Sequence, residues 1–232
     1  MSKKTRCLAV ILLTAATFAS ACAGNRGEDA DEGTSAVVAT GLAAWPSSSF
    51  DDWASYGDAV VILQIESERA EPMSDDEVQR GEGLGLRTVS GTVTQLVWTY
   101  PGGPAPPTTS FEFLTAGWIV REGRSSPMRY AGAIRLEVGS SYLMPIFQDR
   151  TTGSWAPLSS TAAFPVDDES AIEQVATTAE EGAGPEVAMT PSGVAAAMQA
   201  ASPAPAAAAN RQLAPRDRYL AVVAEQTTAD NG

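Results

Sequence analysis

The fold is decided by a stretch that begins Asp58-Ala59-Val60-Val61-Ile62-Leu63-Gln64-Ile65-Glu66 and continues to Val166. After Asp58, the opening segment has five apolar residues and then alternates polar and apolar side chains. A continuous apolar run is typical of a strand buried on both faces, and alternation is typical of a strand with one solvated face. The segment therefore predicts a central strand of a β-sheet.

Further strands are predicted along the same stretch. Residues 87–100 form a long segment whose apolar parity changes near Gln95, which indicates a β-bulge. A proline-rich loop at 101–107 cannot continue a ladder, so residues 110–120 are expected to return as the partner strand. Later strands are expected at 142–147, 155–158 and 163–166, with loops at 70–86 and 121–130.

This pattern predicts a mainly β protein built on a small antiparallel barrel of five or six strands. Two short motifs, Asp58-Ala59-Val60-Val61 and Val138-Gly139-x-x-Tyr142-Leu143, resemble the OB-like barrels of exported proteins, including the netrin-like modules. Netrin-like modules are rich in disulfides, whereas this region has no cysteine. No inhibitor function is therefore carried over from that family.

Helices are expected on both sides of the barrel. Ser49 and Asp52 have the spacing of a capping box, which predicts a short helix through Tyr56. Thr190-Pro191 is typical of a helix start, so a helix is expected to about Ala201, and a second element, helix rather than strand, over 215–225. The two C-terminal elements either pack on the barrel or are loosely attached; the apolar residues available for packing are Val194, Met198, Tyr219, Leu220 and Val223.

The N-terminus has the form of an export leader. A basic start and a short apolar segment lead to Ala19-Ser20-Ala21-Cys22, which resembles the lipobox of bacterial lipoproteins. That resemblance implies cleavage before Cys22 and lipidation of its thiol, which would hold the protein on the outer face of the cytoplasmic membrane. The alternative is an ordinary signal peptidase site after Ala21 and an incidental cysteine.

Composition divides the chain into four expected regions. Residues 1–21 are the signal peptide, 22–46 the lipid anchor and a disordered acidic tether, 47–170 the barrel domain, and 171–232 an Ala/Pro-rich region with short helices. The chain after the leader has 12 arginines, no lysine and 28 acidic residues, so its net charge is near −16. Such a charge disfavours nucleic acid as a partner.

Missing residue types exclude several chemistries. The chain has no histidine, and its only cysteines are Cys7 and Cys22. A Ser-His-Asp triad, a Cys-His pair and a His-ligated zinc site are therefore excluded. No catalytic residue, metal site or cofactor is expected, and the protein is not expected to be an enzyme.

One local charge feature stands out. Four of the 12 arginines fall within fifteen residues of this acidic chain: Arg121, Arg124, Arg129 and Arg135. They either balance nearby acids or form a patch for an anionic partner, such as an envelope protein or an anionic wall polymer. The sequence favours a non-catalytic binding or assembly module; the alternatives are a small-ligand carrier with a pocket lined by Trp98, Trp118 or Trp155, and a carboxylate-based enzyme or metal-dependent module.

Overall fold

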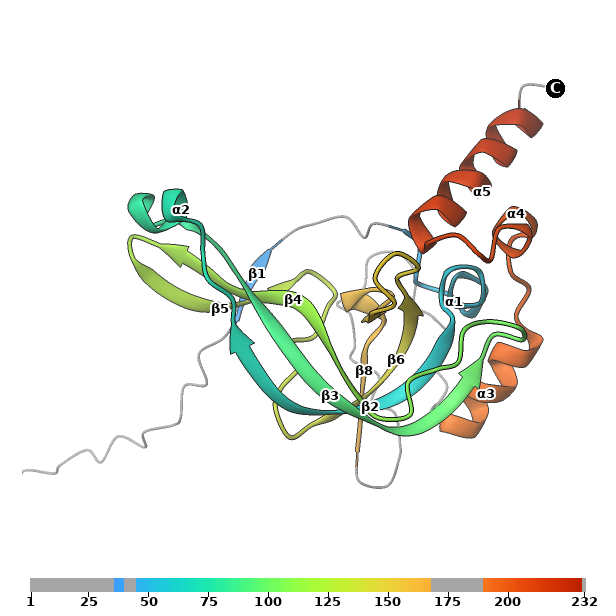
Figure 1. Ribbon diagram of the computed structural model, residues 1–232, viewed down its shortest axis with the longest axis horizontal. Helices are drawn as coiled ribbons and strands as arrows, with labels where there is room; N and C mark the ends of the chain where they lie inside the picture. The colour runs from blue at the N-terminus through green and yellow to red at the C-terminus, as the bar shows by residue number, and fades with distance from the viewer. Residues whose placement is uncertain (1–35, 40–44, 168–189, 231–232) are drawn as a thin grey trace, which may run out of the picture. The chain divides into compact units, whose positions relative to one another are not determined.

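The computed structural model describes residues 36–39, 45–167 and 190–230, which belong to one compact unit spanning residues 34–232. The expected leader, Cys22, most of the tether and residues 168–189 lie outside the described residues. The described chain is mainly β, as predicted, with one eight-stranded sheet (Figure 1).

The sheet is open and mixed. Its hydrogen-bonded order is β1-β5-β4-β3-β2-β6-β7, and β8 pairs with the other part of β6. Every pair is antiparallel except β1 with β5, which is parallel. The strands are β1 (Val37–Ala39), β2 (Ala59–Ala70), β3 (Gly83–Thr99), β4 (Ser110–Arg121), β5 (Arg124–Tyr130), β6 (Ser141–Gln148), β7 (Trp155–Pro157) and β8 (Phe164–Val166).

The structure differs from the expected barrel in strand number and in closure. Eight strands replace five or six, and no ladder among the described residues joins the two ends of the sheet. The sheet nevertheless curls strongly, because β4 and β7 lie close together although they are far apart in the strand order. Long strands with several bulges bend in this way.

The pair β2–β3 carries the bend. Gln95 pairs with Ile62 and Val93 pairs with Leu63, so Thr94 is the extra residue of a bulge. The change of parity predicted near Gln95 is therefore confirmed. The close approach of β2 also explains why residue 91 is a glycine, because a Cβ there would lie 2.8 Å from Leu63 Cγ.

The first five residues of β2, 59–63, are buried on both faces, as the apolar run predicts, and the strand has exposed residues after that. Val60 and Ile62 belong to one core cluster, which also contains residues of the helices. Val61 and Leu63 belong to a second cluster on the opposite face, with Phe113 and other residues of the sheet. The helix α1 (Phe50–Tyr56) packs on the first cluster and has the predicted capping box.

The C-terminal helices pack on the same core. They are α3 (Pro191–Ala200), α4 (Pro205–Ala209) and α5 (Pro215–Asp230). Val194, Met198 and Val222 are buried in the cluster that holds Trp53. Of the residues expected to pack, Leu220 and Val223 instead face solvent, because the buried face of α5 is formed by Pro215, Arg218 and Val222.

Three segments depart from the sequence prediction. The expected loop at 70–86 contains the helix α2 (Asp75–Arg80), which Ser74 and Glu77 cap reciprocally. The expected loop at 121–130 is a tight hairpin and strand β5, whose turn is made by Glu122 and Gly123 at positive φ. Part of the expected tether is strand β1, which pairs with β5.

Candidate functional site

A groove opens where β5 leaves β4. The β4–β5 ladder runs from Arg121 only as far as Trp118, which pairs with Pro127. Proline has no N–H to donate, so a ladder ends readily at this position. Beyond Pro127, strand β5 pairs with β1 instead, and residues 110–117 of β4 have no second partner strand within the described chain.

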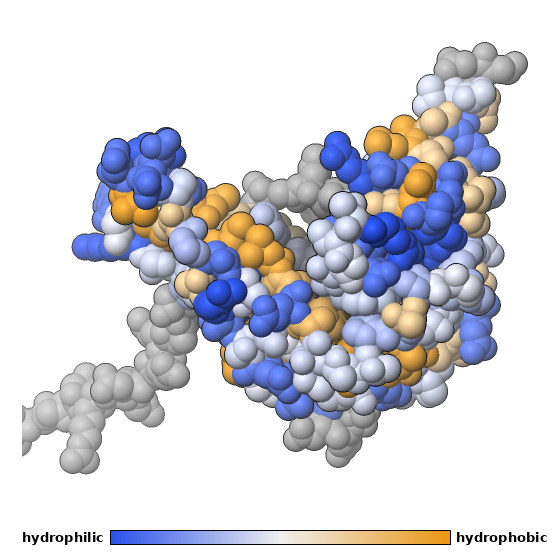
Figure 2. Space-filling view, in the orientation of Figure 1, coloured by the Kyte–Doolittle hydropathy of each residue, from blue (hydrophilic) through white to orange (hydrophobic). Residues whose placement is uncertain are grey.

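The groove has a volume of about 330 Å³ and lies between β4, β5 and β7. Its apolar lining includes Phe113, Met128, Ala133, Leu136 and Ala163, which are buried, and Leu86 and Leu114, which are exposed at the rim. An apolar area over this part of β3 and β4 is visible in Figure 2, beside the hydrophilic α2. A volume near 300 Å³ is at the small end of the range for ligand sites in proteins.

Arg87 and Arg135 occupy the end of the groove where the ladder stops. Arg87 Nε donates to the carbonyl of Ala116 at 3.0 Å, and Arg135 Nη1 donates to the carbonyl of Gly117 at 2.7 Å. Two carbonyls next to the end of the ladder are thus satisfied by side chains instead of a strand. Both arginines also form ion pairs with Glu68, and Arg135 stacks over the ring of Trp118.

Arg87 and Arg135 stabilise the groove through their contacts with the protein itself. Arg87 is 1 % exposed, and burial lowers the pKa of its guanidinium, with a smaller lowering by Arg135 that Glu68 opposes. A buried guanidinium needs both a counter-ion and hydrogen-bond acceptors, and Arg87 has them. Arg87 was not among the residues singled out from the sequence.

Arg129 differs from both. It lines the groove and is half-buried, and its Nη1 donates to the carbonyl of Ala133 at 3.0 Å. Among the residues that the structure describes, no carboxylate lies within ion-pair distance of Arg129. A positive charge at the wall of an apolar groove is therefore left without a counter-ion on this part of the chain.

The four arginines selected from the sequence do not lie together. Arg129 and Arg135 line the groove, whereas Arg121 and Arg124 face each other at the exposed end of the β4–β5 hairpin. Arg124 and Arg129 are five residues apart on one strand, which corresponds to roughly 16 Å. The structure thus separates the two arginines at the hairpin end from the two that line the groove, of which Arg129 lies on β5 and Arg135 in the segment after it.

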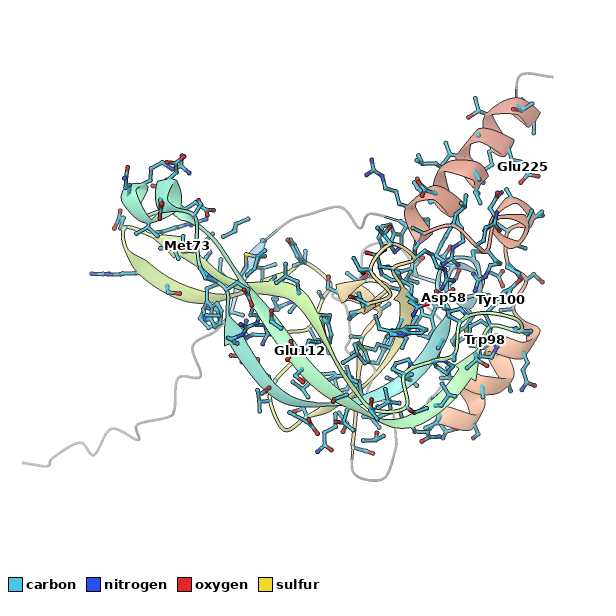
Figure 3. All side chains as sticks on the ribbon, in the orientation of Figure 1. Asp58, Met73, Trp98, Tyr100, Glu112 and Glu225 are labelled. Carbon is cyan, nitrogen blue, oxygen red and sulfur yellow. The ribbon has the colours of Figure 1, made fainter. Side chains whose placement is uncertain are left out.

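A second cluster of charges surrounds Asp58. Its side chain is fully buried, and Oδ1 lies 3.1 Å from Arg150, 3.3 Å from Arg218 and 3.5 Å from Arg211. Oδ2 accepts the backbone N–H of Gln148. Figure 3 shows Asp58 beside Tyr100 at the foot of α5, and the N–H of Tyr100 donates to the carbonyl of Asp58.

This cluster, which we call the Asp58 clasp (Asp58, Arg150, Arg211 and Arg218), joins the C-terminal helices to the sheet. Arg211 donates to the carbonyls of Ala54, Ser55 and Gly57, and its guanidinium lies 3.4 Å above the ring of Tyr100. Burial lowers the pKa of Arg211 to about 10, so it remains charged near neutral pH. One carboxylate thus holds three guanidiniums from two distant parts of the chain.

A second, more polar cavity of about 610 Å³ lies beside β6 and β8 and is lined by Gln64, Gln95, Ser140 and Asp167, among others. Neither cavity is lined by a tryptophan. Trp155 and Trp98 belong to the cores or pack on them, and Trp118 lies under Arg135. The pocket expected for a small-ligand carrier is therefore not formed by these three residues.

The carboxylates of the two clusters do not converge. Asp58 immediately precedes β2 and Glu68 lies ten residues further along that strand, roughly 33 Å of extended chain, and each is paired with arginines. Within the described residues, no group of three acids is placed to hold a metal ion. The helices that the structure describes include none with the length and apolarity needed to cross a bilayer.

Sequence reasoning missed two features of these sites for different reasons. The end of the β4–β5 ladder had a local signal in the sequence. Pro127 follows shortly after a glycine turn, and a proline in a strand indicates that the ladder stops there. The Asp58 clasp had no local signal, because its arginines come from positions 92 to 160 residues away from Asp58.

No protein family, no curated protein and no solved structure matches this chain.

Proposed function

We propose that this protein is a non-catalytic binding or assembly module of the cell envelope, anchored by a lipid on Cys22 and built on an OB-like curled sheet. The curl that brings β4 near β7 supports the OB-like arrangement. The lipobox-like Ala19-Ser20-Ala21-Cys22 supports the anchor. In this proposal the groove between β4, β5 and β7 is the binding site, and its partner is anionic.

The observation that carries the proposal is the position of the Arg129 guanidinium. This half-buried guanidinium borders an apolar groove in a chain with a formal net charge of −13, yet no described carboxylate pairs with it. Taking a guanidinium partly out of water is costly without a counter-ion. A partner that brings a carboxylate or another anion to Arg129 would offset this cost on binding.

Anchoring is tested with the two cysteines of the chain as a matched pair. Cys22→Ala should release the protein from the membrane fraction, whereas Cys7→Ala should leave it there, and the mass of the anchored form should show the lipid. If Cys22→Ala stays in the membrane fraction with unchanged mass, the lipid anchor is wrong.

Binding is tested with labelled poly-glutamate as the anionic probe and the full chain carrying Cys22→Ser. Arg129→Gln should weaken binding by up to roughly five-fold, which is the upper limit for one partly exposed ion pair. Arg121→Gln and Arg124→Gln at the hairpin end are the matched controls and should change it much less. Equal effects of all three variants would exclude the groove as the anionic site.

A further inference from the structure

We infer that the polar cavity beside β6 and β8 is a second binding site, which takes up a short neutral glycan. This cavity is separate from the groove between β4, β5 and β7, so the inference goes beyond the proposed function. It follows from the side chains that line the cavity, from the backbone that fixes them and from the charge of the lining.

The floor of the polar cavity is one face of four adjacent strands, in the order β3-β2-β6-β8. Gln64 of β2 pairs with Ser141 of β6, and Ser141 pairs on its other side with Val166 of β8. Residues directly opposite each other in a ladder have their side chains on the same face of the sheet. Because neighbouring strands lie about 4.8 Å apart, these three side chains form a row roughly 10 Å long. Such a row is long enough to contact both rings of a disaccharide.

Hydrogen bonds hold the two walls of the polar cavity in place. On one side, the hydroxyl of Thr94, the extra residue of the bulge, donates to the carbonyl of Ile62 at 3.2 Å. On the other side, the turn before β6 is tied to β2: the N–H of Gly139 donates to the carbonyl of Ile65 at 2.8 Å, and the N–H of Ile65 donates to the carbonyl of Ser140 at 2.9 Å. β-Bulges often re-aim side chains beside binding sites. A lining fixed in this way loses little conformational freedom when a ligand binds.

Four neutral polar side chains of the lining have all of their hydrogen-bonding groups available to a ligand. Among the residues that the structure describes, none forms a hydrogen bond with the side chains of Gln64, Gln95, Ser140 or Ser141. An amide has both donors and an acceptor, and a hydroxyl both donates and accepts. The hydroxyls of a sugar do the same, so neighbouring hydroxyls of one ring can pair with these groups in either direction. A bound glycan therefore replaces the water that these groups otherwise contact.

The lining favours a neutral glycan over an anionic polymer or a peptide. Of the described residues that line the polar cavity, only Asp167 is charged, so an anionic ligand is repelled. The strands β2 and β6 are paired on both sides where they form the floor, so they offer no strand edge to a peptide. Pro165 and Val166 are half-buried and give the C–H face of a sugar ring an apolar surface. The volume of about 610 Å³ falls within the range of about 300–1,000 Å³ for ligand sites.

The probes are three neutral disaccharides, cellobiose, maltose and N,N′-diacetylchitobiose, titrated into the full chain carrying Cys22→Ser and followed by NMR. At least one of them should bind saturably and shift the side-chain amide signals of Gln64 and Gln95. The signals of Gln226, an exposed glutamine on α5, should not move. The anionic control is the disaccharide of glucuronate and N-acetylglucosamine, which should bind more weakly than the neutral probes because of Asp167.

Two variants of the lining provide a test that leaves the core intact. Gln64 and Gln95 are both exposed, so their truncation removes no core contact. Gln64→Ala and Gln95→Ala should each weaken binding of the neutral disaccharide by roughly two- to ten-fold, the effect of losing one hydrogen bond. Gln226→Ala is the matched control and should leave the affinity unchanged.

The outcomes separate this inference from the proposed function. If none of the three disaccharides binds saturably, or if Gln64→Ala and Gln95→Ala leave binding unchanged, the polar cavity is not a glycan site. Equal or tighter binding of the glucuronate disaccharide would overturn the selection of a neutral ligand. Arg129→Gln should leave disaccharide binding unchanged, and Gln64→Ala should leave the binding of poly-glutamate unchanged; cross-effects between the two would overturn the separation of the two sites.

Discussion

Replacing Asp58 by Asn should destabilise this protein more than any other single substitution of a carboxylate. The change keeps the shape of the side chain but removes the one carboxylate that, among the described residues, pairs with these three guanidiniums, of which Arg218 is fully buried. Breaking a buried ion pair by removing one partner costs about 3–5 kcal/mol. Folded proteins are stable by only about 5–15 kcal/mol, so the loss is a large fraction of the total.

The assay is denaturant unfolding of the full chain, followed by the signal of its tryptophans. Asp149→Asn is the matched control, since Asp149 is a partly exposed residue at a turn, accepts the N–H of Thr151 and pairs with no arginine among the described residues. A difference of less than about 1 kcal/mol between the two variants would refute the reasoning that the clasp stabilises the fold.

A double-mutant cycle tests the charge argument itself. Arg218→Met alone removes the fully buried partner of Asp58, and in the Asp58→Asn background it also removes an uncompensated charge. The double variant should therefore be more stable than the sum of the two losses indicates, with a coupling of roughly 0.5–3 kcal/mol. Strict additivity would mean that the three arginines are held by their carbonyl acceptors and not by Asp58.

Further expectations concern packing and a helix cap. Gly91→Ala should destabilise the protein by roughly 1–3 kcal/mol in the same denaturation assay, because the new Cβ would lie 2.9 Å from the carbonyl oxygen of residue 64. Gly193→Ala in α3 should be neutral or stabilising by up to about 1 kcal/mol, because the nearest neighbour of its new Cβ would lie 3.4 Å away. Met198→Ala should cost about 2–5 kcal/mol and the exposed Leu220→Ala less than about 0.5 kcal/mol; equal losses would contradict the docking of α3 on the shared core. The hydrogen bonds from its N-cap lower the pKa of Glu77, so its stabilisation of α2 should be complete above the unfolded pKa near 4.5 and should disappear as the pH falls through the lower folded value. The protection factors of the α2 amides, which are corrected for the intrinsic pH dependence of exchange, should fall in that acid range, and unchanged protection factors would contradict the cap.

The strands that alternate or run apolar could be predicted from the sequence, and so could the capped α1. Their signals are local, because burial on one or both faces of a strand determines which of its successive residues are apolar. The bulge near Gln95 was visible for the same reason. The helix α2 also had a local signal, the Ser74–Glu77 capping box, but its polar surface made a loop the natural interpretation.

What could not be predicted depends on contacts between distant parts of the chain. Arg211 and Arg218 look like solvated charges in an alanine-rich tail, and only the fold brings them to Asp58. Likewise Arg129 and Arg121 look equivalent in the sequence. The end of the ladder at Pro127 gives them different surroundings, one at a groove and one at a hairpin end.

The most direct test of the binding account is photo-crosslinking in intact cells from two positions of the anchored full chain. One photoreactive residue replaces Ser160, which lines the groove, and the control replaces Thr228, which is exposed on α5. We expect the groove position alone to capture a discrete protein, through an acidic segment identified by mass spectrometry, and Arg129→Gln to reduce that product. The same products from both positions, or a groove product that Arg129→Gln leaves unchanged, would contradict the account.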